Sequence, residues 1–200
     1  MKFGVRWLIV GWNSFKKKVN EKMRRDGSIE RAIELAANTH AGQVDKQGHP
    51  YILHPLRVMV AVAWKENRQG VGLPILGPDL DAMKVAVLHD VCEDTDATPE
   101  DLRIEGFSVS VVEAVRLLTR PPAEAGVHRP TYVQYIRSIK EASKSVYPNS
   151  DMQEAARIAL RVKLADLQDN LSRIEGLPEQ ERSIERRYKR ALDILWGMAD

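Results

Sequence analysis

The stretch VLHDVCEDTD, residues 87–96, ends an apolar helical run with one imidazole and four carboxylates. A His-Asp pair is followed three residues later by a Glu-Asp pair. Between residues 85 and 101 there are six acids and no Lys or Arg. Like charges at helical spacing destabilise a helix unless something neutralises them, and a divalent metal would do so. The alternative is a solvated acidic helix end with His89 on the surface.

Two other segments carry polar residues in apolar helical surroundings. His54 lies in YILHPL just ahead of a predicted helix, where a structural hydrogen bond is the alternative role, and Asp166 lies in ALRVKLADLQDN. Burying a carboxylate without a partner is costly, so Asp166 indicates a site. Together with His89 and Asp90, the residues His54 and Asp166 form a set of nitrogen and oxygen metal ligands from three predicted helices. Such ligands suit Mn²⁺ or Fe²⁺ and do not exclude Zn²⁺.

The rest of the chain predicts helices. Ser28 and Asp79 are good N-caps, and Pro99 with its acidic neighbours suits the first turn of another helix. No alternating strand run or Asn-Gly hairpin turn is visible. The expected helices cover residues 29–42, 55–64, 80–94, a segment from 99, 109–118, 132–142, 154–171 and roughly 179–196. We therefore expect an all-α helical bundle of seven or eight helices over residues 28–200, preceded by an extension, residues 1–27.

Composition narrows the class of protein. Two hundred residues suggest one domain, and 44% hydrophobic with 29% charged residues is ordinary for a globular protein. Thirty basic and 28 acidic side chains give a net charge of +2, which does not favour DNA or broad membrane binding. The single Cys92 excludes an internal disulfide and a multi-Cys zinc site, and we expect it to pack as a small apolar residue. These features favour a cytoplasmic protein.

The N-terminal extension contains the apolar stretch FGVRWLIVGW, which is about ten residues long and includes Arg6. It is too short to span a bilayer, and KKK follows where a secretory signal would place its cleavage site. We expect no membrane span and an extension that packs on the domain or is disordered. A peripheral amphipathic anchor is the alternative.

Three separated motifs, taken together, resemble a known family. HAGQVDKQGHPYILHP (40–55), LHDVCEDTDAT (88–98) and RVKLADLQDN (161–170) occur in the order expected of HD-domain metal-dependent phosphohydrolases. The Glu-Asp pair makes the match narrower. With that pair included, the sequence is similar to the (p)ppGpp hydrolase branch of the family. This branch comprises the hydrolase domains of RelA/SpoT enzymes and the free-standing small alarmone hydrolases. The resemblance covers roughly residues 28–196 and implies an HD-domain helical bundle.

The resemblance also implies roles for individual residues. The metal ligands would be His54, His89, Asp90 and Asp166, holding one Mn²⁺, with Fe²⁺ or Zn²⁺ as other candidates. Glu93 and Asp94 match the acidic pair that activates or positions the attacking water. The substrate contacts would be Lys46, Asn170, Tyr188 and Arg186. His40 and Gln43 match an HxxQ pattern that orders the loop.

The chain departs from the family pattern at two positions. Asp45 stands where an Arg is expected beside Lys46. This removes a cation near the substrate and adds an anion, which leaves the metal chemistry intact but affects nucleotide choice and affinity. Ile184 stands where an Arg partner of Tyr188 is expected, so Arg186 or Arg187 would have to replace it.

The expected activity is hydrolysis of the 3′-pyrophosphate of (p)ppGpp, giving GDP or GTP and pyrophosphate. The chain has no residues for the synthetase domain of RelA/SpoT enzymes, so synthesis is not expected. One alternative is an HD phosphohydrolase for another 3′-phosphorylated nucleotide, such as NADPH or a pyrophosphorylated tRNA end. Another is an antitoxin module with an alarmone-synthetase toxin as its partner. The sequence is also compatible with a homo-oligomer.

Overall fold

The computed structural model of the chain describes residues 25–63, 78–121, 129–174 and 184–198. Helices account for the regular structure of these ranges, and the one strand-like pairing within them is an isolated antiparallel bridge between Val44 and Pro50. The predicted all-α class is therefore confirmed. The helices are α2 (Ile29–Thr39), α3 (Leu53–Val62), α4 (Leu80–Leu88), α5 (Val91–Asp94), α6 (Pro99–Ile104), α7 (Val109–Leu118), α8 (Tyr132–Lys144), α9 (Ser150–Ile174) and α10 (Glu185–Trp196).

Side-chain caps begin several of these helices where the sequence predicts them. Ser28 accepts a hydrogen bond from the N–H of Arg31 at the start of α2, and Asp79 accepts one from Ala82 at the start of α4. Thr98 forms a reciprocal capping box with Asp101 ahead of α6. These contacts satisfy backbone donors that have no partner inside the helix, so local sequence accounts for the helix starts.

One expected helix is interrupted. The sequence predicts a single helix over residues 80–94, but the structure divides it into α4 and α5 at His89 and Asp90. The ring of His89 bonds back to the carbonyl oxygen of Ala86, and the carbonyl of Asp90 accepts the N–H groups of Glu93 and Asp94 to start the next turn. The break lies at the His-Asp pair itself, so these two residues form a joint between two helices.

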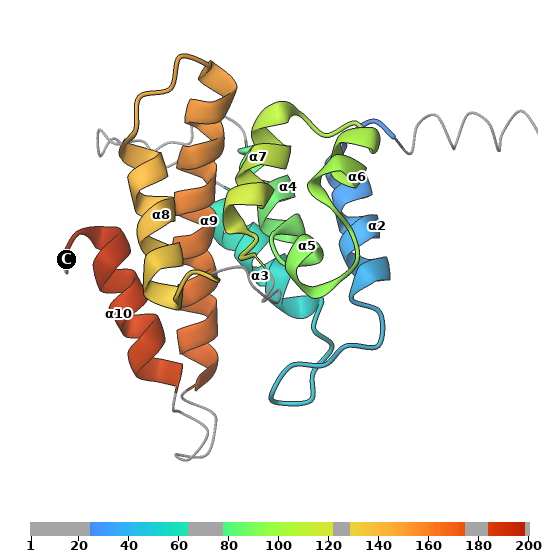
Figure 1. Cartoon of the computed structure of the whole chain (residues 1–200). Helices are drawn as coiled ribbons and strands as arrows, with labels where there is room; N and C mark the ends of the chain where they lie inside the picture. The colour runs from blue at the N-terminus through green and yellow to red at the C-terminus, as the bar shows by residue number, and fades with distance from the viewer. Residues whose placement is uncertain (1–24, 64–77, 122–128, 175–183, 199–200) are drawn as a thin grey trace, which may run out of the picture.

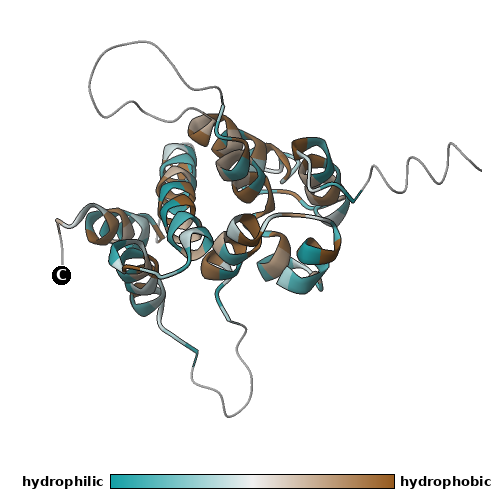
Figure 2. Ribbon diagram, turned by 90° about the horizontal axis from the view of Figure 1, so that it is seen from above, coloured by the Kyte–Doolittle hydropathy of each residue, from teal (hydrophilic) through white to brown (hydrophobic). Residues whose placement is uncertain are grey.

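Helix α9 is the centre of the bundle. It packs against α3, α4 and α7 on one side and against α8 and α10 on the other, as Figure 1 shows. Helix α4 is also central, because Val85, Ala86, Val87 and Leu88 are all fully buried. A helical turn that is apolar on every side, as the last turn of α4 is, belongs in the interior, and Figure 2 shows the hydrophobic residues turned toward the middle of the bundle. This packing brings the N-terminal end of α3, the C-terminal end of α4 and the C-terminal half of α9 together.

The residues just before α2 are attached to the domain. The N–H of Gly27 donates to the carbonyl of Glu105, and a Cβ on Gly27 would lie 2.2 Å from the carbonyl oxygen of Gly106. Both glycines have positive φ, so a side chain at either would be strained and would separate the two backbones. Residues 1–24 of the predicted extension lie outside the described residues. Among the helices that the structure does describe, none has the length and apolar character needed to cross a membrane.

Candidate metal centre and active site

Three buried side chains from three different segments meet in the middle of the bundle. His54 is the second residue of α3, His89 follows α4, and Asp166 lies in the middle of α9. Each offers a ligand atom within 4.8 Å of the others. The Oδ1 atom of Asp166 is 3.2 Å from Nε2 of His54 and 3.8 Å from Nε2 of His89. Three of the four predicted metal ligands therefore form one group.

The orientation of His89 fits a ligand. Its Nδ1 is 2.7 Å from the carbonyl oxygen of Ala86, which can only accept, so Nδ1 carries the hydrogen. The Nε2 atom is buried and makes no hydrogen bond to any described residue, although it lies 3.0 Å from Oδ2 of Asp90. A buried ring nitrogen without a hydrogen bond is costly in a protein interior, and a metal ion would satisfy it. The residues present thus fit a divalent ion.

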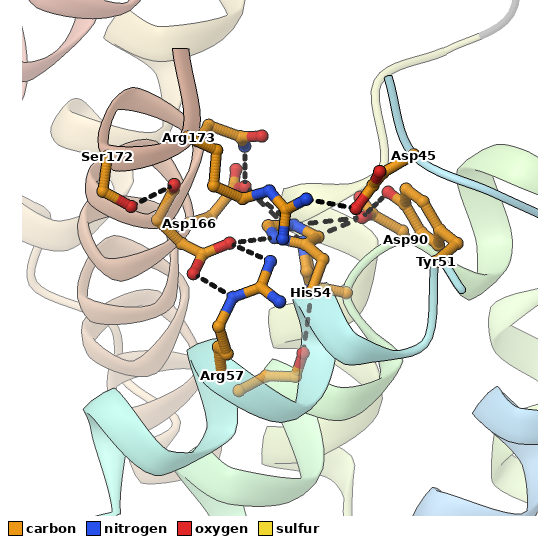
Figure 3. A network of polar contacts seen from close by, with 12 residues as sticks. Asp45, Tyr51, His54, Arg57, Asp90, Asp166, Ser172 and Arg173 are labelled. Atoms are coloured by element: carbon orange, nitrogen blue, oxygen red, sulfur yellow. Dashed lines mark hydrogen bonds and ion pairs between the residues drawn. The ribbon is translucent and has the colours of Figure 1, made fainter. Parts of the chain in front are cut away.

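Asp90, the fourth predicted ligand, flanks this group. Its Oδ2 atom is 3.7 Å from Nε2 of His54, in addition to its short distance from His89. The hydroxyl of Tyr51 donates to the same oxygen at 2.5 Å. The side chains of Tyr51, His54 and Asp90 lie together in Figure 3. Tyr51 was not predicted as a site residue, since an aromatic residue in a loop carries no sequence signal for this contact.

Asp166 has two further partners, of which one was not predicted. The ammonium of Lys163 lies 2.7 Å from Oδ2, and the side-chain amide of Asn170 donates to Oδ1 at 2.5 Å. Burial alone would raise the pKa of Asp166, but Lys163 and the two imidazoles hold that pKa well below its ordinary value. Asp166 is therefore an anion, as a metal ligand must be. The spacing of three residues between Lys163 and Asp166 was the available sequence signal.

A cavity of about 430 Å³ opens beside this group. Glu93 and Asp94 line it, as do His54, Asp90 and Asp166. Partial burial at the cavity wall raises the pKa of Glu93 and of Asp94, and in each case the negative charge of Asp90 adds to that effect. The predicted acidic pair thus lies next to the candidate ligands with its proton affinity increased.

The loop between α2 and α3 forms another wall of the cavity. There the carboxylate of Asp45 accepts the N–H groups of Gln47, at 2.8 Å, and His49, at 3.0 Å. It also forms an ion pair with Arg173, whose backbone carbonyl accepts a hydrogen bond from the Gln47 side chain. Figure 3 shows Arg173 reaching from α9 to Asp45. The anion that the sequence adds at position 45 is therefore paired, and exposed Lys46 beside it lines the cavity.

Aromatic and basic side chains from α8 and α10 form the remaining wall. The guanidinium carbon of Arg187 lies 4.9 Å from the ring centroid of Tyr132 and 5.5 Å from that of Tyr188. All three residues line the cavity, as does Ile184. Arg186 is exposed and is not among the lining residues. Arg186 and Arg187 are the candidates to replace the Arg expected at position 184, and Arg187 is the one that lines the cavity. Tyr132 was not predicted from the sequence as a site residue.

Two secondary expectations concern His40 and Cys92. The Nδ1 of His40 lies 2.9 Å from the side-chain oxygen of Gln43, which agrees with a role of both residues in ordering the loop. Cys92 is half-buried against the core, and burial raises the pKa of its thiol to about 11. A thiol with that pKa is unreactive near neutral pH, so Cys92 has a packing role.

Comparison with known proteins agrees with the motifs. The chain is 30% identical over 173 residues, 85% of its length, to a guanosine-3′,5′-bis(diphosphate) 3′-pyrophosphohydrolase of Borreliella burgdorferi. It is 32% identical over 162 residues, 80% of its length, to the protein of that name in Vibrio cholerae. The bifunctional (p)ppGpp synthase/hydrolase SpoT of Escherichia coli is 30% identical over 160 residues, 79% of the chain. No protein-family model matches the chain.

The chain spans about a fifth of the length of these relatives, namely 23%, 20% and 20%. Within the chain, however, the similarity extends over about four fifths of the residues. This homology supports the (p)ppGpp hydrolase domain family, to which the helical fold and the three motifs also point. The chain is thus a relative of (p)ppGpp 3′-pyrophosphohydrolases.

Proposed function

We propose that this protein hydrolyses the 3′-pyrophosphate of (p)ppGpp in a metal-dependent reaction, giving GDP or GTP and pyrophosphate. The observation that carries the proposal is the buried group of His54, His89 and Asp166, which opens on a cavity with Glu93 and Asp94 at its wall. The names of the relatives supply the substrate class.

One divalent ion would be held by His54, His89, Asp90 and Asp166, and we propose Mn²⁺. Two imidazoles and two carboxylates suit Mn²⁺ or Fe²⁺, and Zn²⁺ also accepts them. When bound, such an ion supplies positive charge for the pyrophosphate and lowers the pKa of water. In support, His54, His89 and Asp166 offer ligand atoms within 4.8 Å of one another, and Asp90 lies beside them.

The side chains at the cavity wall would carry the proton transfer. Glu93 or Asp94 accepts a proton from the attacking water, whose oxygen bonds to the phosphorus attached to O3′. The bond between that phosphorus and O3′ breaks, and O3′ takes up a proton. A base works best when its pKa approaches the working pH, and the raised pKa values of Glu93 and Asp94 move in that direction.

The remaining cavity residues would bind the nucleotide. Lys46 on the loop and Arg187 on α10 offer cations to the phosphates. Tyr188 offers a ring for stacking, and Asn170 offers a side-chain amide next to Asp166. Arg186 remains a candidate from the sequence, although it lies outside the cavity lining.

The test is incubation of the purified, Mn²⁺-loaded protein with ppGpp, followed by measurement of GDP and pyrophosphate. Equimolar release of both is expected, and protein with Glu93→Gln and Asp94→Asn should release them about 10²–10⁴-fold more slowly. Absence of pyrophosphate release from Mn²⁺-loaded wild-type protein would overturn the proposal.

A second substrate class is favoured by Asp45. Asp45 and Arg173 both line the cavity and neutralise each other, so position 45 does not supply the extra positive charge that the family pattern contains. Another 3′-phosphorylated nucleotide, such as NADPH or a pyrophosphorylated tRNA end, would then be the better substrate. A panel of nucleotides ranked by kcat/KM decides between the two, and ppGpp at the top rejects this alternative.

A further inference from the structure

A carboxylate outside the cavity contacts one of the candidate metal ligands from behind. Asp169 lies three residues after Asp166 on α9, and its side chain is 11% exposed. Its Oδ2 atom is 2.7 Å from Nδ1 of His54. It is not among the residues that line the cavity, so a nucleotide in the cavity would not touch it.

This contact determines which nitrogen of His54 can bind a metal. Both oxygens of Asp169 accept hydrogen bonds from the guanidinium of Arg57, so this group is a carboxylate, which only accepts hydrogen bonds. The hydrogen on His54 must then be on Nδ1. The Nε2 atom, which lies 3.2 Å from Asp166 and 3.7 Å from Asp90, is the one left to present a lone pair to an ion.

Asp169 is itself held in place by an arginine. The Nε and Nη2 atoms of Arg57 donate to its two oxygens at 2.6 and 2.9 Å. Such a two-point contact fixes the plane of a carboxylate as well as its position. Arg57 lies three residues after His54 on α3, so the three side chains also connect α3 to α9. These are the two helices that bring His54 to Asp166.

The two imidazoles are therefore supported differently. His89 donates its Nδ1 hydrogen to the backbone carbonyl of Ala86, which no substitution can remove. His54 donates to a side chain from another helix. A carboxylate behind a metal-binding imidazole fixes the ring and increases its basicity, and its loss typically weakens metal binding by about 10–100-fold.

We propose that Asp169 is a positioning residue for the metal centre, which sets the tautomer and ring orientation of His54, and that Arg57 fixes Asp169 for this purpose. The inference rests on the proposed function, because it takes His54 as a metal ligand. It adds a second layer of the centre that neither the motifs nor the comparisons assign.

The first experiment measures Mn²⁺ affinity by calorimetric titration, without substrate. Asp169→Ala should weaken binding about 10–100-fold. Asp169→Asn should weaken it less, because the amide oxygen can still accept from His54. Arg57→Met should give an intermediate loss. Asp151→Ala is the control, since Asp151 is an exposed acid in the first turn of the same helix, and it should bind as the wild type does.

The second experiment reads the tautomer directly. Long-range ¹H–¹⁵N spectra of the metal-free protein at alkaline pH should show His54 with its hydrogen on Nδ1. Asp169→Ala should lose this preference, while His89 keeps it. Far-UV circular dichroism of the same samples checks the fold, and Asp169→Asn and Arg57→Met replace Asp169→Ala if that variant is unfolded.

The outcomes separate the two proposals. Wild-type protein that binds no Mn²⁺ contradicts the proposed function, while the His54 spectrum still decides the role of Asp169. If the wild type binds Mn²⁺ and folded Asp169→Ala binds it equally well, the positioning role is wrong. An unchanged His54 tautomer in folded Asp169→Ala also overturns it.

Discussion

The two sides of the cavity differ in how much freedom their residues have. On the side proposed to hold the metal (the metal side), His54, His89 and Asp166 are 6%, 1% and 4% exposed. On the side proposed to bind the nucleotide (the nucleotide side), Lys46 and Arg187 are exposed. Buried polar groups must have partners with good geometry, whereas exposed groups can be satisfied by water. The metal side therefore tolerates few changes, whereas exposed residues of the nucleotide side can change without loss of the fold.

The largest effect is expected from the metal side. Asp166→Ala should abolish metal binding and activity, because it removes the carboxylate oxygen closest to Nε2 of His54, while helical content largely persists. Asp166→Asn is the isosteric companion, since Asp166→Ala also leaves Lys163 buried without its partner. Elemental analysis and circular dichroism measure the two properties. Wild-type metal content in either variant would contradict the assignment of this ligand.

The next effect concerns the acidic pair. A positioned base typically contributes about 10²–10⁴-fold to a rate, so Glu93→Gln combined with Asp94→Asn should lower kcat by that range. Mn²⁺ affinity should stay near the wild-type value, because neither residue belongs to the buried ligand group. Glu113→Gln, a change of an acid outside the cavity, is the control. Loss of metal binding in the double variant would assign the pair to the metal centre instead.

Glu93 and Asp94 should also determine how kcat falls at acid pH, on the acid limb of the pH profile. A protonated carboxyl cannot accept a proton, so activity falls as pH falls through the pKa of the base. Because burial raises the pKa of Glu93 and Asp94, the midpoint of this limb should lie above the ordinary values of 4.5 and 3.8. Measurement of kcat against pH at saturating Mn²⁺ tests this. An acid limb that is unchanged in the Glu93→Gln, Asp94→Asn double variant would exclude both residues as the base.

A smaller effect is expected where the loop is tied to α9. Asp45→Asn and Arg173→Gln should each raise KM roughly tenfold, equivalent to about 1.4 kcal/mol, because the loop that carries Lys46 loses its ion pair with α9 and keeps only the hydrogen bond of Gln47 to the Arg173 carbonyl. Metal affinity should not change. The KM of the double variant should be little higher than that of either single variant, since both substitutions remove the same ion pair. Fully additive effects would show that the ion pair is not what positions the loop.

The smallest effect distinguishes two neighbours on α10. Arg187→Ala should raise KM several-fold, since Arg187 lines the cavity beside Tyr132 and Tyr188. Arg186→Ala should leave KM unchanged, because that side chain is exposed and outside the lining. The pair forms its own matched control. A larger effect of Arg186→Ala would reverse the assignment and support the residue that the sequence resemblance offered first.

Much of the metal side could be predicted from the sequence because its signals are local. His89 and Asp90 end an apolar run, and Asp166 lies inside one, so both patterns indicate buried polar residues that need a partner. The break between α4 and α5 was not predicted. At the break the His89 ring bonds to the carbonyl oxygen of Ala86, a contact that helical periodicity does not reveal.

The nucleotide side was harder to predict for a physical reason. Exposed residues have no periodic pattern, and their partners are set by which segments pack together. Asp45 looked like an unpaired anion because Arg173, its partner, is 128 residues away in the chain. Tyr132 carried no polar or charged signal that would separate it from ordinary core residues.

The sequence by itself determined the helices, their caps and the residue types at the candidate centre, because propensity, capping and periodicity act over a few neighbouring residues. Only the tertiary structure decided how these residues are supported. Asp169 meets His54 across 115 residues of chain, and Asp45 meets Arg173 across 128. Both contacts exist because α3 and the preceding loop pack against α9. Pairing at such separation follows from the packing of whole helices.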